Sequence, residues 1–418
     1  MAIFSRLEPT DAGAPGRALW MSTIAFTLCF AVWTIFAIIG IRIKQDLGLT
    51  ETEFGLLVGT PVLTGSLVRL LLGIWTNRYG GRLVYTLTML ASAAATFALA
   101  YARTYPEMLI AGLGVGLAGG SFAVGVAYVS PFFPAGKQGT ALGIFGAGNV
   151  GAAVTKFLAP FVLIAWGWQA VAEIWAAVLA LMAVVFWFTT SDDPAFRNRA
   201  ARVQKSFLQE LEPLKSLQVW RFSLYYFFAF GGFVALSLWL PRYLVGVYGF
   251  DLETAGMVAA AYSIPGSLFR AYGGVLSDRI GARTVMYLML LVAAITTLIL
   301  SLPATPGILP IAITPLVFVV VVFALGFVMS LGKAAVYKHI PVYYPESVGA
   351  VGGLVGMIGG LGGFVLPIAF GALKDATGLW SSCFLLLFVV VAVSLAWMHL
   401  AIRRIERRAA SAPAGVTA

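Results

Sequence analysis

Charged residues are scarce in this 418-residue chain, at 11% of the sequence, whereas hydrophobic residues make up 60%. A soluble protein carries roughly a quarter charged residues, so the composition excludes a soluble enzyme and a nucleic-acid-binding protein. Cys29 and Cys383 are the only cysteines and lie in apolar runs at opposite ends of the chain, which excludes a disulfide scaffold and a cysteine-ligated metal site. His339 and His399 are the only histidines, and the sequence has no carboxylate pair or metal-ligand cluster. We therefore expect neither an enzyme nor a metal or cofactor.

Long apolar runs occupy most of the chain. A helix needs about 20 apolar residues to cross a bilayer core, and the charged and Gly/Pro clusters separate twelve such runs. They predict an all-α integral membrane protein with transmembrane helices near 19–41, 54–76, 83–101, 107–130, 139–162, 167–189, 220–245, 254–276, 284–302, 314–337, 348–372 and 379–401. The first run follows a segment of mixed charge without a cleavage site, so we interpret it as a retained helix and not as a signal peptide.

The net charge of +10 is spread over the ends of these runs. With the N-terminus inside, the cytoplasmic segments hold 17 of the 27 lysines and arginines, and the segments on the other side hold five. Because cytoplasmic loops are enriched in lysine and arginine, we expect a multi-pass protein of the bacterial inner membrane with both termini in the cytoplasm. Its partners would be membrane lipid and a small solute, without nucleic acid, and the chain would act as a monomer.

An internal repeat divides the chain into two halves. A polar stretch predicts an N-terminal six-helix half at 1–190, a cytoplasmic linker at 191–219 and a C-terminal six-helix half with a short tail at 220–418. The segments GSLVRLLLGIWTNRYGGRLV and GSLFRAYGGVLSDRIGARTV align at a constant offset of 201, with identities at Gly65/Gly266, Ser66/Ser267, Leu67/Leu268, Arg69/Arg270, Gly73/Gly274, Arg78/Arg279, Gly80/Gly281 and Arg82/Arg283. Two homologous six-helix halves are typical of transporters whose site lies between them near the membrane midplane.

Arg69 and Arg270 are the repeat partners that point to a substrate. Each lies eight residues before the inner end of its span, which is about 12 Å into the membrane. An arginine at that depth costs at least ~2.5 kcal/mol on insertion scales, so it should face a cavity or an ion partner. The alternative is a structural pair with a carboxylate, but only Glu173 among the 17 acidic residues falls clearly inside a span. The missing partner is therefore predicted to be a small anion.

The fifth and eleventh spans are rich in glycine, reading GIFGAGNVGAA and GGLVGMIGGLGGF. Small residues at three- and four-residue spacing let helices approach closely and slide. We assign a conformational role to Gly146, Gly148, Gly151, Gly359, Gly360, Gly362 and Gly363. Ordinary tight packing is the alternative for any one of them.

Several polar and aromatic residues are candidates for the cavity. Asn149 is embedded in the fifth span, where it would hydrogen-bond either a substrate or another helix. Five aromatic residues are predicted to line the cavity, with packing against core or lipid as the alternative for each: Trp33, Phe36, Phe122, Tyr226 and Phe230. The last two are four residues apart and share a helix face.

The inner ends of the second and eighth spans share the pattern Gly-x-x-x-Asp-Arg-x-Gly-x-Arg, with Asn77 in place of the first aspartate. Its other singled-out residues are Gly73, Arg78, Arg82, Gly274, Asp278, Arg279 and Arg283. A charged turn at this place can pair with a neighbouring helix end and bias the inward- or outward-open state. This is the inner-loop motif of the major facilitator superfamily, which the chain resembles over its whole length.

Within that superfamily the chain resembles the nitrate/nitrite porter family, through the paired arginines and the segments SFAVGVAYVSPFFPAGKQGTALGIFGAGNVGAAVTKF at 121–157 and GAVGGLVGMIGGLGGFVLPIAFG at 349–371. The resemblance implies that Arg69 and Arg270 hold one nitrate or nitrite between them, flanked by aromatic side chains. It also places Phe122, Asn149, Tyr226 and Phe230 in matching stretches. The segments VTKF and GKAAVYKHIP look more like the proton-coupled branch of the family.

We therefore expect secondary active transport of nitrate, and of nitrite nearly as well, by proton symport. Importing one anion against an inside-negative 100 mV costs about 2.3 kcal/mol, which co-transported protons would offset. Without a carboxylate at mid-depth, the titratable candidates are Lys156, Lys333 and Lys338, although snorkelling to the interface is the favoured interpretation for Lys338. Nitrate/nitrite antiport is the main alternative. An organic-anion carrier or a membrane sensor is a further alternative, and a sensor would usually carry a soluble domain.

Overall fold

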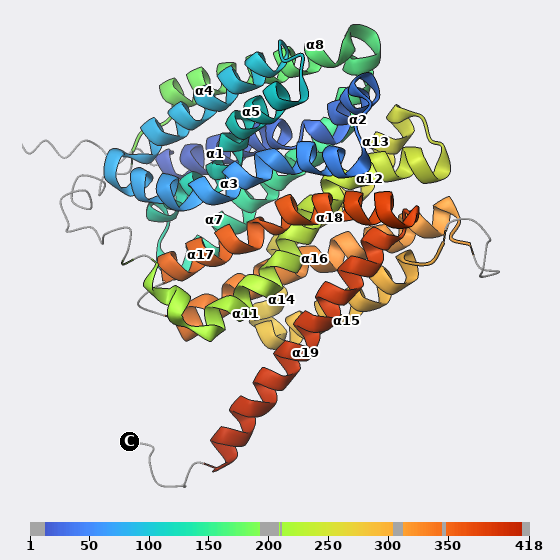
Figure 1. Cartoon of the computed structure of the whole chain (residues 1–418). Helices are drawn as coiled ribbons and strands as arrows, with labels where there is room; N and C mark the ends of the chain where they lie inside the picture. The colour runs from blue at the N-terminus through green and yellow to red at the C-terminus, as the bar shows by residue number, and fades with distance from the viewer. Residues whose placement is uncertain (1–12, 193–208, 210, 304–311, 345–347, 412–418) are drawn as a thin grey trace, which may run out of the picture.

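The computed structural model describes residues 13–192, 209, 211–303, 312–344 and 348–411, and these are almost entirely helical, with no strand among them. Figure 1 shows the blue-to-green helices packed beside the yellow-to-red helices in one bundle. The predicted linker lies largely outside the described residues.

The first half runs from α1 to α8. Its elements are α1 (Ala14–Trp33), α2 (Phe36–Leu47), α3 (Glu51–Tyr79), α4 (Gly81–Leu99), α5 (Tyr105–Val115), η1 (Gly116–Gly120), α6 (Ser121–Val129), η2 (Ser130–Phe132), α7 (Ala135–Gly146), η3 (Ala147–Val150) and α8 (Gly151–Thr189). The second half consists of η4 (Glu212–Lys215), α11 (Leu217–Tyr226), η5 (Phe227–Gly232), α12 (Phe233–Tyr248), α13 (Leu252–Leu268), α14 (Arg270–Ile280), α15 (Ala282–Leu300), α16 (Pro315–Tyr343), α17 (Val348–Gly360), α18 (Gly362–Thr377) and α19 (Ser382–Ser411).

The twelve predicted spans are confirmed, but several are interrupted helices. Ten described segments are long and apolar enough to cross a membrane. One of them provides two crossings because Gly167, with a φ of +87°, breaks α8, and α13 with α14 forms the remaining crossing, broken at Phe269. The fourth span contains the 3-10 helix η1 and the seventh contains the π-helix η5. Apolar runs indicate which segments are buried, but they do not show where a helix changes its hydrogen-bond pattern. The sequence therefore did not predict these breaks.

Glycine makes room for an aromatic side chain at the same repeat position in both halves. A Cβ added at Gly65 would lie 2.6 Å from Trp33 Nε1, and one at Gly266 would overlap the ring of Phe233. Both glycines lie four residues before the paired arginines. The repeat therefore conserves a steric requirement next to each arginine.

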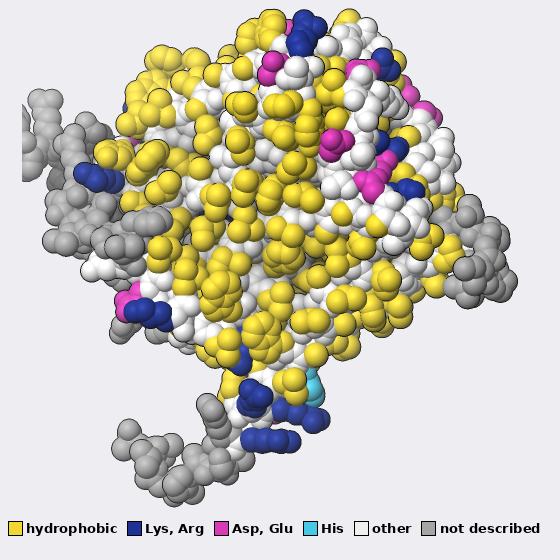
Figure 2. All heavy atoms as spheres, viewed as in Figure 1, with side chains coloured by type: hydrophobic (Ala, Val, Ile, Leu, Met, Phe, Trp, Pro, Cys, Tyr) yellow, Lys and Arg dark blue, Asp and Glu magenta, His cyan; other side chains and the backbone are white. Residues whose placement is uncertain are grey.

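The outer surface of the bundle is apolar. Figure 2 shows hydrophobic side chains over most of the visible face, with charged side chains gathered towards its edges. Large apolar residues such as Phe188, Leu316 and Ile110 are 78%, 75% and 70% exposed. Soluble monomers rarely expose such extensive apolar surface, so this surface matches a hydrocarbon core.

The turns define two ends of the bundle. We call the end with the turns at 79–82 and 280–283, where the described chain also begins and ends, the terminal face. The opposite end, with the turns at 47–51, 248–252 and 377–382, is the distal face. Towards the distal face, α3 of the first half packs against α18 of the second. A Cβ added at Gly55 would overlap the carbonyl of Pro367, so the two backbones are in direct contact.

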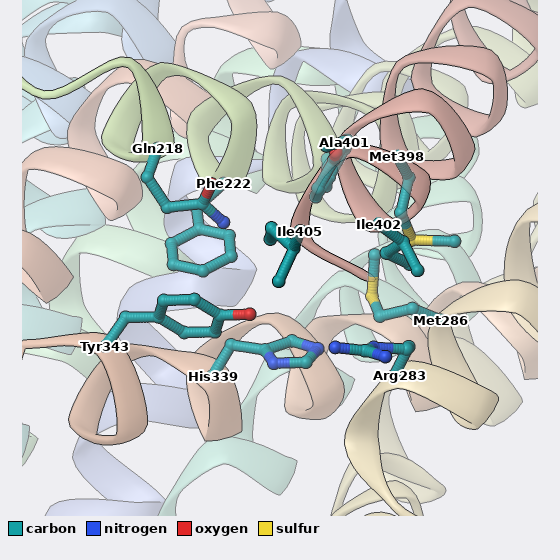
Figure 3. Close-up of a pocket in the computed structure, with 11 residues that line it drawn as sticks. Gln218, Phe222, Arg283, Met286, His339, Tyr343, Met398, Ala401, Ile402 and Ile405 are labelled. Atoms are coloured by element: carbon teal, nitrogen blue, oxygen red, sulfur yellow. The ribbon is translucent and has the colours of Figure 1, made fainter. Parts of the chain in front are cut away.

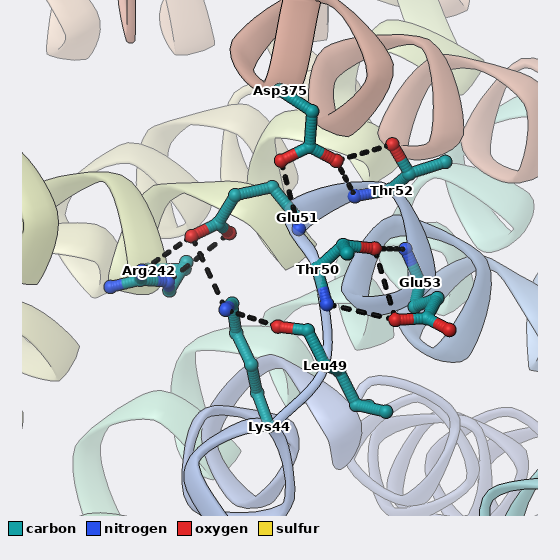
Figure 4. A network of polar contacts seen from close by, with 8 residues as sticks. All are labelled: Lys44, Leu49, Thr50, Glu51, Thr52, Glu53, Arg242 and Asp375. Atoms are coloured by element: carbon teal, nitrogen blue, oxygen red, sulfur yellow. Dashed lines mark hydrogen bonds and ion pairs between the residues drawn. The ribbon is translucent and has the colours of Figure 1, made fainter. Parts of the chain in front are cut away.

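A polar network, which we call the distal latch, joins the halves at the distal face (Figure 4). Glu51 begins α3, is 8% exposed, and accepts hydrogen bonds from Arg242 of α12, whose Nε lies 3.3 Å away. Lys44 Nζ lies 3.5 Å from the same carboxylate. Asp375 of α18 accepts from the backbone N–H groups of Glu51 and Thr52 at 3.2 and 2.8 Å. A carboxylate of the second half thus caps a helix of the first.

Replacing Glu51 with glutamine should weaken the distal latch, because a neutral amide cannot form an ion pair with Arg242. Loss of about 1.4 kcal/mol would raise the population of distally open molecules tenfold. We expect longer and broader distances between spin labels at Tyr101 and Leu379, exposed residues of the two halves near this face, in double electron–electron resonance. Glu53→Gln is the matched control, because among the described residues the Glu53 carboxylate bonds only to Thr50 in the same capping box. Equal distance distributions in the two variants would contradict the role of the latch.

Candidate functional site

Arg69 is held by backbone carbonyls and aromatic rings and not by a carboxylate. It lies in α3 and is 4% exposed. Its Nε donates to the carbonyl of Gly119 at 3.3 Å, and its Nη1 donates to the carbonyl of Gly356 at 3.2 Å. Its Cζ lies 4.9 Å from the ring centroid of Phe230 and 5.7 Å from that of Trp33. Because Gly356 belongs to α17, Arg69 connects the two halves.

Arg270 has an unused donor. It is the first residue of α14, directly after the break at Phe269, and it is 9% exposed. Its Nη1 is buried and finds no hydrogen-bond partner among the residues that the structure describes. A buried polar group left unpaired costs about 1–3 kcal/mol, and more when it is charged. The arrangement therefore favours a ligand that supplies an acceptor at this nitrogen.

Phe122 lies against both arginines. Its ring centroid is 5.8 Å from Arg69 Cζ and 5.1 Å from Arg270 Cζ, and the two guanidinium groups are close enough to interact electrostatically. Tyr226 and Phe230 stack on each other with centroids 5.2 Å apart, so that Phe230 brings this stack to Arg69. The structure thus gathers five of the predicted site residues at one place.

Asn149 lies in η3 and is 1% exposed, and both atoms of its amide are buried without a partner. The preceding turn is close to Arg270, since a Cβ added at Gly146 would lie 3.4 Å from Arg270 Cδ. Buried amides are normally hydrogen-bonded. The interhelical bond that was the alternative for Asn149 does not form among the described residues, so its amide is free for a polar ligand.

No carboxylate pairs with either arginine within the described residues. The ion pairs found there belong to other basic groups, at the distal latch, along helices and at the terminal face. The described residues also contain no group of three His, Cys, Asp or Glu side chains placed to hold a metal ion. The site therefore has an excess of positive charge and matches a small anion.

Trp33 and Phe36 differ in their relation to the site. Trp33 packs against Arg69 and donates from Nε1 to the carbonyl of Pro61 at 2.8 Å. Phe36 is fully buried in the first half, 3.5 Å from the position of a Cβ at Gly112. That Phe36 also lines the cavity stays a prediction.

Lys156 is fully buried and connects the halves. From α8 its Nζ donates to Ser237 Oγ of α12 and, at 2.7 Å, to Ser263 Oγ of α13. A third bond, at 3.3 Å, goes to the carbonyl of Ala152. Neutral oxygens thus surround the ammonium group, which raises the cost of keeping it charged.

Lys333 is also fully buried, whereas Lys338 is not. Lys333 Nζ donates to the carbonyl of Gly266, one turn before Arg270 at the break between α13 and α14. Lys333 and Arg270 are close enough to interact electrostatically. The side chain of Lys338 is 49% exposed and forms an ion pair with Asp278 at the terminal face. Lys338 therefore lies outside the site, as its interfacial interpretation implied.

Gly148 and Gly151 of the fifth span are required for packing within the first half, whereas Gly146 faces Arg270. A Cβ added at Gly148 would lie 2.6 Å from the ring of Phe26, and one at Gly151 would overlap the backbone of Thr27 in α1. The packing alternative therefore accounts for both.

The glycines of the eleventh span approach two different helices. A Cβ at Gly359 would lie 2.6 Å from Tyr226, and one at Gly362 would lie 2.8 Å from the carbonyl of Phe227, both within the second half. Gly360 instead contacts Ser66 and Arg69 in α3 of the first half, and Gly363 lies between Val62 of α3 and Val234 of α12. These two are placed where one half would move against the other.

The inner-loop glycines Gly80 and Gly281 have φ values of +96° and +86°, a conformation that favours glycine. In the first copy, Asp192 Oδ1 accepts a hydrogen bond from the backbone N–H of Arg82 at 2.9 Å. Arg82 Nε also donates to the carbonyl of Trp187 at 2.8 Å. In the second copy, Arg283 lies 3.4 Å from a carboxylate oxygen of α19. The two loops therefore share a glycine backbone conformation, but their arginines contact different groups.

Other motif positions are less constrained. A Cβ added at Gly73 or Gly274 would meet nothing within 4 Å. Arg78 and Arg279 lie in the last turns of their helices, where positive charge favours the helix dipole.

Tyr337 of α16 lies at the site but was not among the residues predicted from the sequence. Its hydroxyl donates to the carbonyl of Gly352 at 3.0 Å, and its ring lies 5.0 Å from that of Tyr226 and 5.9 Å from Arg270 Cζ. It follows Lys333 by four residues, and this helical spacing was a signal that could have placed it on the face of the site.

A separate cavity of about 30 Å³ lies in the second half near the terminal face (Figure 3). Phe222, Arg283, His339 and Tyr343 are among its lining residues, and His339 stacks on Phe222 with centroids 5.8 Å apart. Neither arginine of the pair lines it, so it is distinct from the anion site.

Comparison with known proteins relates this geometry to transporters. The Major Facilitator Superfamily profile matches residues 21–318 and 248–418. A Thermus thermophilus protein named probable nitrate/nitrite antiporter NarK1 is 42% identical, over 94% of this chain and 93% of its own length. The Mycobacterium tuberculosis protein named probable nitrate/nitrite transporter NarK2 is 34% identical, over 90% and 92%. The inward-facing crystal structure of a bacterial homolog of the human lysosomal transporter Spinster covers 94% of this chain and 98% of its own, with a TM-score of 0.74 and 17% identity.

Replacing Arg270 with lysine should remove most anion binding while the protein still folds, because lysine keeps the charge but lacks the planar fork. Loss of one charge-assisted hydrogen bond of about 1.5–3 kcal/mol corresponds to roughly tenfold to hundredfold weaker binding. Isothermal titration calorimetry with nitrate measures the change, and Lys338→Arg, at the terminal face, is the control. Unchanged affinity in a well-folded Arg270→Lys protein would show that the pair is structural.

Proposed function

Because the chain belongs to the nitrate/nitrite porter family of the major facilitator superfamily, we propose that it is a secondary active transporter of nitrate, and of nitrite nearly as well. The observation that carries this proposal is the buried pair of Arg69 and Arg270, which has an unused donor and no carboxylate partner among the described residues. Nitrate is planar and weakly hydrated. Its oxygens suit guanidinium forks and its faces suit aromatic rings.

Alternating access follows from where the site lies. The anion would contact Arg69 from the first half and Arg270 from the second, and the distal latch closes one route to it. We take the terminal face as cytoplasmic, with the chain in the bacterial inner membrane as a monomer. Residues 1–190 and 220–418 would rock against each other around the linker, and transport requires neither a catalytic step nor a cofactor.

Energetics favour coupling to protons. An inside-negative potential of 100 mV opposes import of one anion by about 2.3 kcal/mol. One proton cancels the charge, and two make the potential favourable by about 2.3 kcal/mol. Import that relies on the proton gradient therefore needs a group that takes up a proton when the anion binds.

Lys333 and Lys156 are the groups we propose for this coupling. Without an anion, Lys333 and Arg270 place two positive charges close together in a buried site. Loss of the Lys333 proton relieves that repulsion, and an arriving anion restores the advantage of the charged form. Lys156 has only neutral partners and bridges the halves, so its charge would change the balance between conformations.

Nitrate/nitrite exchange is the second candidate. It is supported by the relative named probable nitrate/nitrite antiporter, and it is also electroneutral. The arginine pair serves both mechanisms, since the two anions differ by one oxygen.

Uptake into nitrite-free proteoliposomes separates the two mechanisms. Under symport, an inward proton gradient of one pH unit is worth about 1.4 kcal/mol per proton and should accumulate nitrate about tenfold for each co-transported proton. Uptake that ignores the gradient and occurs only with nitrite inside would establish exchange.

Replacing Lys333 with methionine should abolish gradient-driven uptake, because methionine fills a similar volume but carries no proton. Nitrate/nitrite counterflow should continue, since it needs no net proton movement. Lys338→Met is the matched control and should behave as the wild type, because Lys338 lies at the surface. Proton-driven uptake that survives in Lys333→Met and in Lys156→Met would exclude both lysines.

A further inference from the structure

Ser66 has an unused hydroxyl beside the arginine pair. It lies in α3, is fully buried, and its Oγ has no hydrogen-bond partner within the described part of the chain. Two other hydroxyls of the same helix are satisfied locally: Thr60 donates to the carbonyl of Leu56 and Thr76 to that of Leu72, each at 2.7 Å. Leaving a buried hydroxyl unpaired destabilises the protein. A ligand that accepts a hydrogen bond from Ser66 would remove this cost.

The repeat partner of Ser66 has a hydroxyl that is already hydrogen-bonded. Ser267 lies three residues before Arg270, as Ser66 lies three before Arg69, and it donates to the carbonyl of Ser263 at 2.7 Å. The two serines have the same place in the repeat and different hydrogen bonding. The asymmetry makes Ser66 the one of this pair that is available to a ligand.

The Ser66 hydroxyl lies close to Gly360 of α17. A Cβ added at Gly360 would be 2.6 Å from Ser66 Oγ and 3.4 Å from Arg69 Nη1. The hydroxyl and the guanidinium therefore border the same stretch of α17 that carries no side chain. An anion oxygen held by Arg69 would be within reach of a donor from Ser66.

We propose that Ser66 Oγ is a further ligand of the transported anion and favours nitrate over nitrite. The inference rests on the proposed function and adds a specificity determinant to it. Nitrite has two oxygens, which the two arginines occupy. Nitrate has a third, which accepts the hydrogen bond from Ser66 in addition to those from Arg69 and Arg270.

Calorimetric titration of Ser66→Ala with nitrate and with nitrite tests the proposal. Loss of one hydrogen bond to a charged group should weaken nitrate binding about tenfold and change nitrite binding less than twofold. Without anion, the melting temperature should stay the same or rise, because the substitution removes an unsatisfied buried group. A residue needed only for packing would lower the melting temperature.

Ser267→Ala is the matched control, since it removes a hydroxyl that is already bonded to its own helix, and it should leave both affinities unchanged. Nitrate affinity within twofold of the wild type in Ser66→Ala, or equal losses for the two anions, would overturn the proposal. Failure of the wild-type protein to bind nitrate would instead contradict the proposed function.

Discussion

The structure depends on two guanidinium groups that are buried without a carboxylate partner among the described residues. Arg69 is stabilised by carbonyls of Gly119 and Gly356 and by the faces of aromatic rings, but none of these neutralises its charge. Arg270 retains an unused Nη1. Burial of unbalanced charge is expensive in a low-dielectric interior, so the site is poised to gain free energy from a small anion. Among the described residues, the hydroxyl of Ser66 is also left unpaired close to Arg69.

The same constraint links anion binding to the relative position of the halves. Arg69 and Arg270 belong to different halves, and the bond from Arg69 to Gly356 crosses between them. Gly360 and Gly363 let α3 approach closely at this level, and the backbones of α3 and α18 touch further towards the distal face. A movement of Arg69 when the anion binds would therefore change the contact between the halves. The distal latch adds a second, polar contact that must break before the site opens on that side.

The sequence predicted the architecture and the centre of the site because both follow from composition and repetition. Twelve apolar runs, the offset of 201 and the shortage of midmembrane carboxylates were sufficient to single out Arg69 and Arg270. The cavity role of Phe36 stays a prediction, because the sequence does not say which neighbour a helix face meets. The helix break at Phe269, the approach of Tyr337 and the cap by Asp375 were not predicted, because they depend on contacts between distant segments. Asn77 left the first inner loop without the acid of the motif, and only the fold shows that Asp192 bonds to this loop at Arg82.

The central claim is that one anion completes an otherwise unbalanced arginine pair. The most direct test is an experimental structure of the protein determined with nitrate and again without it. We predict density for one planar anion between Arg69 and Arg270, next to Phe122, with Arg270 Nη1 donating to it and with no such density in the anion-free protein. A site that remains empty at saturating nitrate, or a carboxylate side chain paired with Arg270, would contradict it.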